Sequence, residues 1–62
     1  MFQRGQFVVM TAGGDWKGRR ACVLSIAPRS EWRYLVAVEP AAGEKMVMTV
    51  KVRENQLKDY AP

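Results

Sequence analysis

The sequence predicts a small all-β domain in which five short strands close into a barrel, with one 3₁₀ turn before the last strand. Apolar residues alternate or run in blocks of strand length, which is typical of strands rather than of helices. Turn residues such as Gly and Pro separate these blocks. We expect a closed barrel because closure removes most of the exposed sheet edge. Residues 1–62 contain no linker or repeat, so a single domain is expected to fill the chain.

The first half of the chain supplies two strands. The apolar block 7–10 forms the first strand, and the paired glycines and Asp15 after it form the turn, since Gly readily adopts positive φ angles. Residues 20–26 form the second strand. Pro28 ends this pattern, because proline lacks the N–H group that a sheet ladder needs.

The second half supplies three more strands. Residues 32–39 have the alternation and the aromatic and β-branched side chains of a half-buried strand. Residues 45–53 alternate most clearly, and four of their apolar side chains share the face predicted to enter the core: Met46, Met48, Val50 and Val52. Residues 54–57 suit one 3₁₀ turn that carries Leu57 into the core. Residues 58–60 form the closing strand.

Size and composition argue against catalysis. The chain has 62 residues and no histidine, so it lacks the commonest general base and metal ligand. Cys22 is the only cysteine, so no disulfide can form within the chain, and we expect an inert, half-buried thiol there. A domain of this size buries only about 60% of its unfolded surface, so self-association stays open as a further source of stability. We expect a protein that is not an enzyme and holds no cofactor or metal.

No segment is expected to enter a membrane. The longest apolar runs, 7–10 and 35–38, are far shorter than the roughly 20 residues of a spanning helix. The first residues lack the apolar stretch of a signal peptide. A lone cysteine is typical of a reducing compartment, so we expect a cytoplasmic protein.

Positive charge is concentrated in the first half of the chain. The formal net charge is +4, and residues 1–34 carry all of the excess, with six basic side chains against Asp15 and Glu31. Residues 35–62 hold four side chains of each sign. A localised basic field favours a polyanion or an acidic protein surface as partner, although ordinary solubility also explains such a charge.

One turn and strand resemble a known motif. Residues 17–26, KGRRACVLSI, resemble the KOW motif of ribosomal proteins and NusG-like transcription factors, in which a basic-glycine turn precedes a strand with apolar residues spaced like Val23 and Ile26. Gly5, with Phe7 and Val9, resembles the strand before that motif. The resemblance covers about the first 26 residues. It implies a five-stranded SH3-like barrel, with RNA, a ribosomal particle or the transcription machinery as partner.

Two other SH3-like groups look similar. Residues 3–5 and 52–57 resemble parts of electron-transport accessory barrels, which are docking subunits without catalysis of their own. Residues 16–18 resemble a Trp-x-Gly feature of the type II dihydrofolate reductases. Residues 47–52 contain neither the Gln nor the Tyr of that family's pore strand, so we do not expect that activity.

The cationic candidates for binding fall at two places along the chain. Three of them lie at the predicted hairpin tip. Exposed cations there either neutralise phosphates or are the ordinary charged residues of a solvated turn. Two more flank the start of the third strand. In sequence order these candidates are Lys17, Arg19, Arg20, Arg29 and Arg33.

The aromatic candidates are Trp16, Trp32 and Tyr34, which would form a shelf beside these charges. Such a shelf would stack bases or grip a proline-rich or helical ligand. Tyr34 is predicted to belong to the core instead, and Trp32 is open between surface and core. Trp16 lies in a polar loop and is the ring expected to be exposed. Met10 is predicted to fill the core with the two methionines of the fourth strand.

Two functions stay open at this point. The first is a non-catalytic module that binds RNA, DNA or a ribonucleoprotein through the basic tip and the loop tryptophan, with salt-sensitive affinity. The second is a protein-docking or assembly subunit that uses an aromatic and apolar face. It would form a discrete oligomer or hold a partner protein, and it would be indifferent to nucleic acid.

Overall fold

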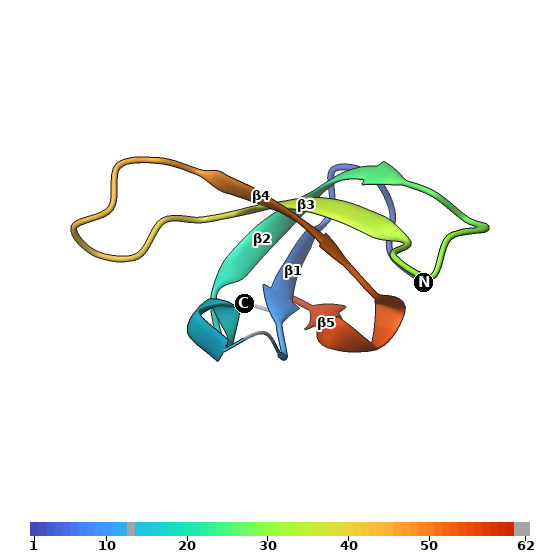
Figure 1. Ribbon diagram of the computed structural model, residues 1–62, viewed down its shortest axis with the longest axis horizontal. Coiled ribbons are helices and arrows are strands. Elements are labelled where there is room, and N and C mark those ends of the chain that lie inside the picture. The colour runs from blue at the N-terminus through green and yellow to red at the C-terminus, as the bar shows by residue number, and fades with distance from the viewer. Residues whose placement is uncertain (13, 61–62) are drawn as a thin grey trace.

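The computed structural model describes residues 1–12 and 14–60 and confirms an all-β chain. Within these residues, five antiparallel strands form one sheet in the order β4-β3-β2-β1-β5 (Figure 1). The strands are β1 (Phe7–Met10), β2 (Arg20–Ile26), β3 (Tyr34–Val38), β4 (Met48–Val52) and β5 (Leu57–Asp59). Two 3₁₀ helices, η1 (Gly14–Trp16) and η2 (Glu54–Gln56), precede β2 and β5. Among the described residues, no helix has the length and hydrophobicity that crossing a membrane requires.

Strands β1 and β2 have the predicted bounds, whereas β3 and β4 are shorter than predicted. The ladder between β2 and β3 ends where Ile26 faces Tyr34, so Trp32 has no strand partner. The ladder between β3 and β4 ends where Val38 faces Met48. Continuing it would bring Pro40 into the sheet, and proline has no N–H to donate. The last strand occupies 57–59 rather than 58–60, and the turn predicted after the first strand contains the short helix η1.

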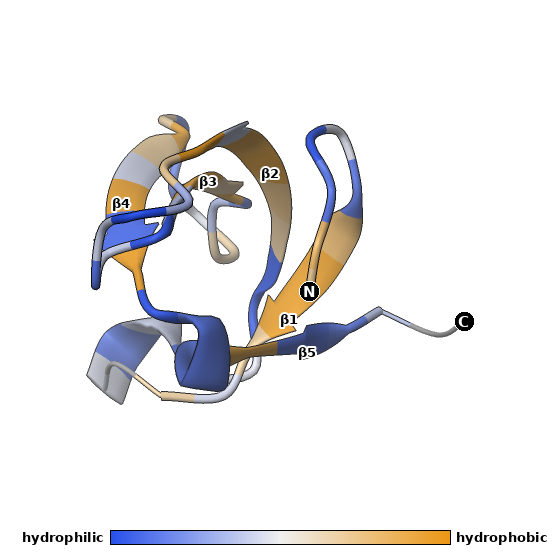
Figure 2. Cartoon of the chain, turned by 90° about the vertical axis from the view of Figure 1, so that its right-hand side faces the viewer, coloured by the Kyte–Doolittle hydropathy of each residue, from blue (hydrophilic) through white to orange (hydrophobic). Residues whose placement is uncertain are grey.

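The sheet is strongly curved but not closed, so the predicted closed barrel is not observed. Within the described residues, the edge strand β4 pairs only with β3, and the edge strand β5 pairs only with β1. Figure 2 shows the strands curling around a common interior. Leu24 adds to the curvature, because it is an extra residue between Val23, opposite Val36, and Ser25, opposite Leu35. Such a bulge bends its strand and increases the local twist.

The core lies inside the curved sheet and takes side chains from all five strands. Tyr34 is fully buried as predicted, and η2 carries Leu57 into the core, where it is 7% exposed. The prediction that Met46 and Met48 fill the core is wrong, since they are 74% and 46% exposed. β4 begins only at Met48, so these side chains lie at and beyond the end of the sheet. The buried residues are Val8, Met10, Ala21, Val23, Tyr34, Val36, Val38, Val52 and Leu57.

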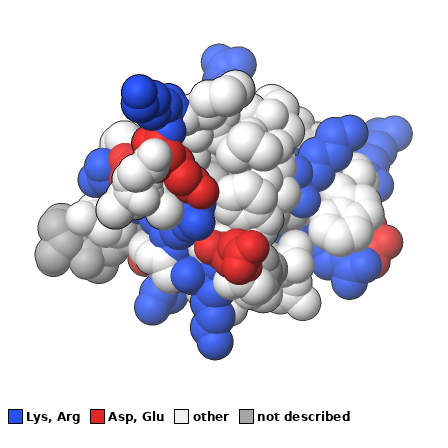
Figure 3. Space-filling view, turned by 60° about the vertical axis from the view of Figure 1, so that its left-hand side comes forward, with Lys and Arg blue, Asp and Glu red and all other residues white. Residues whose placement is uncertain are grey.

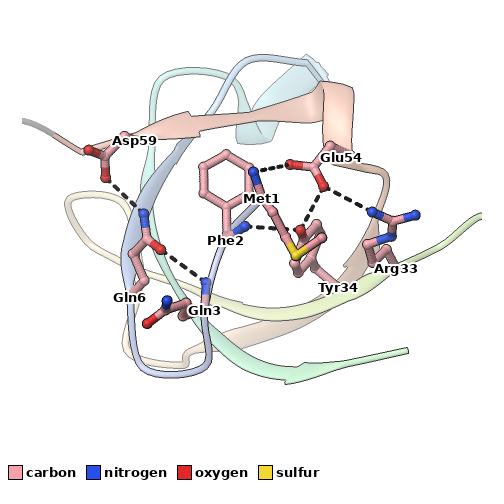
Figure 4. A network of polar contacts seen from close by, with 8 residues as sticks. All are labelled: Met1, Phe2, Gln3, Gln6, Arg33, Tyr34, Glu54 and Asp59. Carbon is pink, nitrogen blue, oxygen red and sulfur yellow. Dashed lines mark hydrogen bonds and ion pairs between the residues drawn. The ribbon is translucent and has the colours of Figure 1, made fainter. Parts of the chain in front are cut away.

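Tyr34 joins three parts of the chain through its hydroxyl group (Figure 4). The hydroxyl donates to Glu54 Oε1 at 2.7 Å and accepts the Phe2 N–H at 3.1 Å. The Phe2 ring packs edge-on against the Tyr34 ring, with centroids 5.6 Å apart. Arg33 Nη1 lies 3.3 Å from the same oxygen of Glu54. The Tyr34 hydrogen bond, with the charges of the amino group of Met1 and of Arg33, lowers the pKa of Glu54 below its usual value.

Candidate functional site

The β1–β2 tip, residues 14–20, forms the turn that the sequence predicts. The N–H of Lys17 donates to Gly14 O at 3.2 Å, and the N–H of Gly18 donates to Met10 O at 2.8 Å. Gly18 has φ of +87°, in the left-handed region that favours glycine over residues with a Cβ atom. The tip is therefore held by its backbone, with Lys17 exposed.

Carboxylates from the β3–β4 connection neutralise both arginines of this tip. Arg19 Nη1 lies 3.0 Å from Glu44 Oε1, and Arg20 Nε donates to Glu39 Oε1 at 2.8 Å. The hydrogen bond with Glu39 raises the pKa of Arg20. The backbone N–H of Ala41, with the charge of Arg19, lowers the pKa of Glu44. Of the three cationic candidates at the tip, Lys17 is the one without an ion pair to a described residue.

The two tryptophans do not form one aromatic shelf. Trp16 is partly buried against the core, with the Arg19 guanidinium 5.3 Å from its ring centroid, so the prediction of an exposed ring is wrong. Trp32 is the more exposed of the two residues, at 44%. β2 separates the two, because the tip ends at the first residue of β2 and the β2–β3 loop follows its last residue (Figure 1). A strand of this length spans on the order of 20 Å.

The β2–β3 loop, residues 27–33, holds Trp32 in place. The N–H of Ala27 donates to Arg33 O at 2.7 Å and closes the base of the loop. The N–H of Trp32 donates to Ser30 Oγ at 3.1 Å. The Arg53 guanidinium lies over the Trp32 ring, 4.5 Å from its centroid, and an ion pair of 3.0 Å with Glu31 fixes Arg53 in turn. Trp32 is therefore an exposed ring with a defined orientation.

Two hollows border this loop, and a third lies beside the end of β2 that leads into it. The first has a volume of about 210 Å³ and is bordered by Trp32, Leu35 and Lys51, among others. It shares Ala27 and Ser30 with a second hollow at Arg29, and Ser25 with a third hollow at Arg4. We call this continuous area the β2–β3 loop surface. Its charged and aromatic members are Arg4, Arg29, Trp32, Arg33 and Lys51.

The β2–β3 loop surface carries positive charge with little compensation. Arg4, Arg29 and Lys51 are exposed and have no ion pair with any residue among 1–12 and 14–60. Arg33 shares Glu54 with Tyr34 and the amino group of Met1. No Asp or Glu of the described chain borders any of the three hollows. Figure 3 shows one face of the molecule, on which acidic side chains lie beside basic ones.

The structure thus divides the sequence-predicted residues between two ends of β2. Arg29, Trp32 and Arg33 share the β2–β3 loop surface, whereas Trp16, Lys17, Arg19 and Arg20 belong to the tip at the other end. Sequence reasoning missed Arg4 and Lys51. Lys51 lies opposite Leu35 in the ladder, on the solvent face that the alternation of residues 45–53 already indicated. The N–H of Gly5 donates to Val23 O at 2.7 Å and so fixes the backbone next to Arg4 beside β2. No pattern in the sequence predicts that contact.

The described residues also bear on metal binding and on the state of the thiol. Among residues 1–12 and 14–60, no group of His, Cys, Asp or Glu side chains is arranged to hold a metal ion. Cys22 is half-buried, as predicted. A scan against protein-family models, a search of curated proteins and a search of solved structures each find no match. The geometry of the β2–β3 loop surface is therefore the basis for a functional proposal.

Proposed function

We propose that this protein binds nucleic acid and contacts the phosphate backbone with the β2–β3 loop surface. The observation that carries the proposal is the gathering of Arg4, Arg29 and Lys51 around adjoining hollows that no described carboxylate borders. When cations without an acidic partner contact phosphates, the nucleic acid releases its condensed counterions, and this release supplies nearly all of the affinity in non-specific binding. The proposal includes RNA, DNA and ribonucleoprotein particles as targets and assigns no catalytic residue.

The β1–β2 tip is a weaker candidate for the same role. Arg19 and Arg20 already have carboxylate partners, Glu44 and Glu39. A phosphate would have to displace these carboxylates, so part of its interaction energy would be lost in breaking existing pairs. The residues that resemble a KOW motif are therefore placed less favourably for phosphate contact than the loop at the other end of β2.

The proposal also includes two predictions made from the sequence, the SH3-like architecture and the cytoplasmic location. The curved five-stranded sheet with a 3₁₀ turn before β5 supports an SH3-like architecture. The resemblance of residues 17–26 to the KOW motif supports the same architecture. We also propose that the protein acts in the cytoplasm, which the single half-buried thiol of Cys22 supports.

Fluorescence anisotropy with short labelled RNA and DNA strands and duplexes tests this proposal. The informative variant is the double substitution Arg29→Glu with Lys51→Glu. We expect its affinity to fall at least roughly tenfold on every sequence, because phosphate contacts carry no sequence information. The matched control is Lys45→Glu with Lys58→Glu, which makes the same change in net charge at two exposed lysines outside the β2–β3 loop surface.

The control separates a localised site from general charge attraction. We expect it to retain affinity within about threefold, the residual effect being long-range attraction that salt screens. Equal losses in the two double variants would contradict a site at the β2–β3 loop surface. Undetectable binding of the unmodified protein at low salt would contradict nucleic-acid binding itself.

A second candidate function is self-assembly through the edge strand β4. The arm, residues 39–47, projects from the sheet (Figure 1) and continues into an exposed apolar stretch, Met46 to Met48. Antiparallel pairing of β4 with β4 of a second copy about Val50 sets Met48 opposite Val52 and Thr49 opposite Lys51. No two like charges face each other directly between residues 46 and 54 in this register. The pairing would satisfy the open edge and cover the exposed methionines.

The molar mass in solution tests this second candidate. We expect a concentration-dependent dimer in sedimentation analysis, and loss of that dimer in the double variant Met46→Ser with Met48→Ser. A monomer at all accessible concentrations would contradict self-assembly. The proposal of nucleic-acid binding would still stand.

A further inference from the structure

Trp32 has an exposed aromatic ring that packing does not require. Trp32 as a residue is 44% exposed and is not one of the core residues. Its backbone N–H is bound by Ser30 Oγ at 3.1 Å, and the Arg53 guanidinium covers a face of the ring. Arg53 is held in turn by Glu31. The ring therefore keeps its place without a ligand, which lowers the entropic cost of binding one.

The hollow beside Trp32 has the composition of a small site for a planar ring. Trp32 and Leu35 supply apolar walls, Ser25 and Ser30 supply hydroxyl groups, and Arg33 and Lys51 supply positive charge. Its volume of about 210 Å³ is below the roughly 300–1,000 Å³ of sites for drug-sized ligands. A single nucleobase combines a flat apolar face with polar edges, so it fits both the size and the lining of this hollow.

The neighbouring cations indicate how the rest of a strand would lie. The hollow beside Trp32 adjoins the hollow at Arg29 through Ala27 and Ser30, and it adjoins the hollow at Arg4 through Ser25. A base in the central hollow would therefore have cations close to the phosphates that precede and follow it. This is the combination by which proteins hold single strands, a basic path with an aromatic ring on which bases stack.

We infer that the ligand of the β2–β3 loop surface is a single-stranded nucleic acid that stacks one unpaired base on Trp32. The inference rests on the proposed function. It adds that the nucleic acid is single-stranded and that Trp32 is the residue on which a base stacks. In a duplex the bases are already stacked on one another and paired, so they cannot enter the hollow without being flipped out. A duplex would meet only the cations, whereas a single strand would meet the cations and the ring.

Tryptophan fluorescence tests this inference at one residue. The Trp16→Phe variant leaves Trp32 as the only tryptophan, since the chain contains two. Titration with a short homopolymeric single strand is expected to quench this emission and to reach saturation. A duplex of the same length is expected to leave the emission nearly unchanged. Anisotropy of the labelled oligonucleotides then gives the affinity for each form.

Substitution of Trp32 provides the second readout. In Trp32→Ala, the affinity for the single strand is expected to fall about 5- to 150-fold, the usual effect of losing one stacked base. The affinity for the duplex is expected to stay within about twofold, because phosphate contacts are unchanged. Trp32→Phe keeps an aromatic face and is expected to retain most of the single-strand affinity. Circular dichroism of each variant confirms that the sheet is intact.

The outcomes separate this inference from the proposed function. Equal affinity for single strands and duplexes, with no quenching of Trp32, would overturn stacking and leave phosphate binding in place. Loss of affinity for both forms in Trp32→Ala would also overturn stacking, because it would assign Trp32 a role in positioning the cations. Absence of binding to either form would overturn the proposed function as well.

Discussion

Removal of the Tyr34 hydroxyl is expected to destabilise the fold by about 2 kcal/mol. A hydrogen bond to a charged group contributes about 1.5–3 kcal/mol, and the Tyr34 hydroxyl makes such a bond to Glu54. We take the lower half of that range because the Glu54 side chain remains 40% exposed, so water replaces part of the lost bond. The unpartnered Phe2 N–H adds up to about 1 kcal/mol. For a domain of this size, a loss of about 2 kcal/mol lowers Tm by roughly 8–16 °C.

The dependence of this effect on pH identifies Glu54 as the partner. The pKa of Glu54 is lowered in the folded state. Its contribution to stability is therefore present above the unfolded value of about 4.3, and is lost as pH falls through the folded value. Urea unfolding of Tyr34→Phe and of the unmodified protein at pH 7 and at about pH 3 measures the difference. We expect the difference to be smaller at the lower pH than at pH 7, because Glu54 loses its charge as the pH falls.

Tyr60→Phe is the matched control, because it removes the same hydroxyl group from an exposed tyrosine. It is expected to change the free energy of unfolding by no more than about 0.5 kcal/mol. A loss below about 0.5 kcal/mol in Tyr34→Phe at pH 7 would refute the reasoning, because the bond would then contribute nothing measurable. The same loss at both pH values would also refute it, since Glu54 would not be the group that responds.

Three further variants test the packing and the conformation of the backbone. Leu57→Ala is expected to cost about 2–4 kcal/mol in urea unfolding, because Leu57 is buried beside η2; a cost below about 1 kcal/mol would contradict its place in the core. Met46→Ser with Met48→Ser is expected to change the stability of the monomer by less than about 1 kcal/mol, and a larger loss would indicate that these side chains are buried after all. Gly18→Ala is expected to cost about 1–2 kcal/mol through its positive φ alone, since a Cβ atom there meets no other atom within 4 Å; an unchanged urea midpoint would contradict the left-handed conformation.

Local patterns predicted the strands well but not where their ladders end. The blocks 7–10 and 20–26 coincide with β1 and β2, because apolar side chains and turn residues mark both ends. The alternation of residues 45–53 predicts a strand. It does not show that β3 ends at Val38, so that residues before Met48 have no strand to pair with. Met46 and Met48 were misplaced for that reason. Closure of the sheet likewise requires the two edge strands to pair with each other. A local pattern of residues does not determine that long-range pairing.

The sequence predicted the kinds of residue in the candidate site better than it predicted where those residues lie in the fold. Arg29, Trp32 and Arg33 stand out in sequence as aromatic and basic neighbours, and the structure gathers them on one surface. The neutralisation of Arg19 and Arg20 could not be foreseen, because their partners Glu44 and Glu39 come from a connection about 20 residues away. Ion pairs between distant segments decide which cations remain available, and only the fold determines them.

The salt dependence of binding to a short single strand tests the central claim most directly. Three unpaired cations on the β2–β3 loop surface predict a slope of log affinity against log salt of roughly −2, or a fall of roughly 20-fold between about 50 and 200 mM salt. The double variant Arg29→Gln with Lys51→Gln leaves Arg4 of the three, so its slope is expected to be about −0.7. A slope near zero in the unmodified protein, or an unchanged slope in the double variant, would contradict the assignment of this surface to phosphate binding.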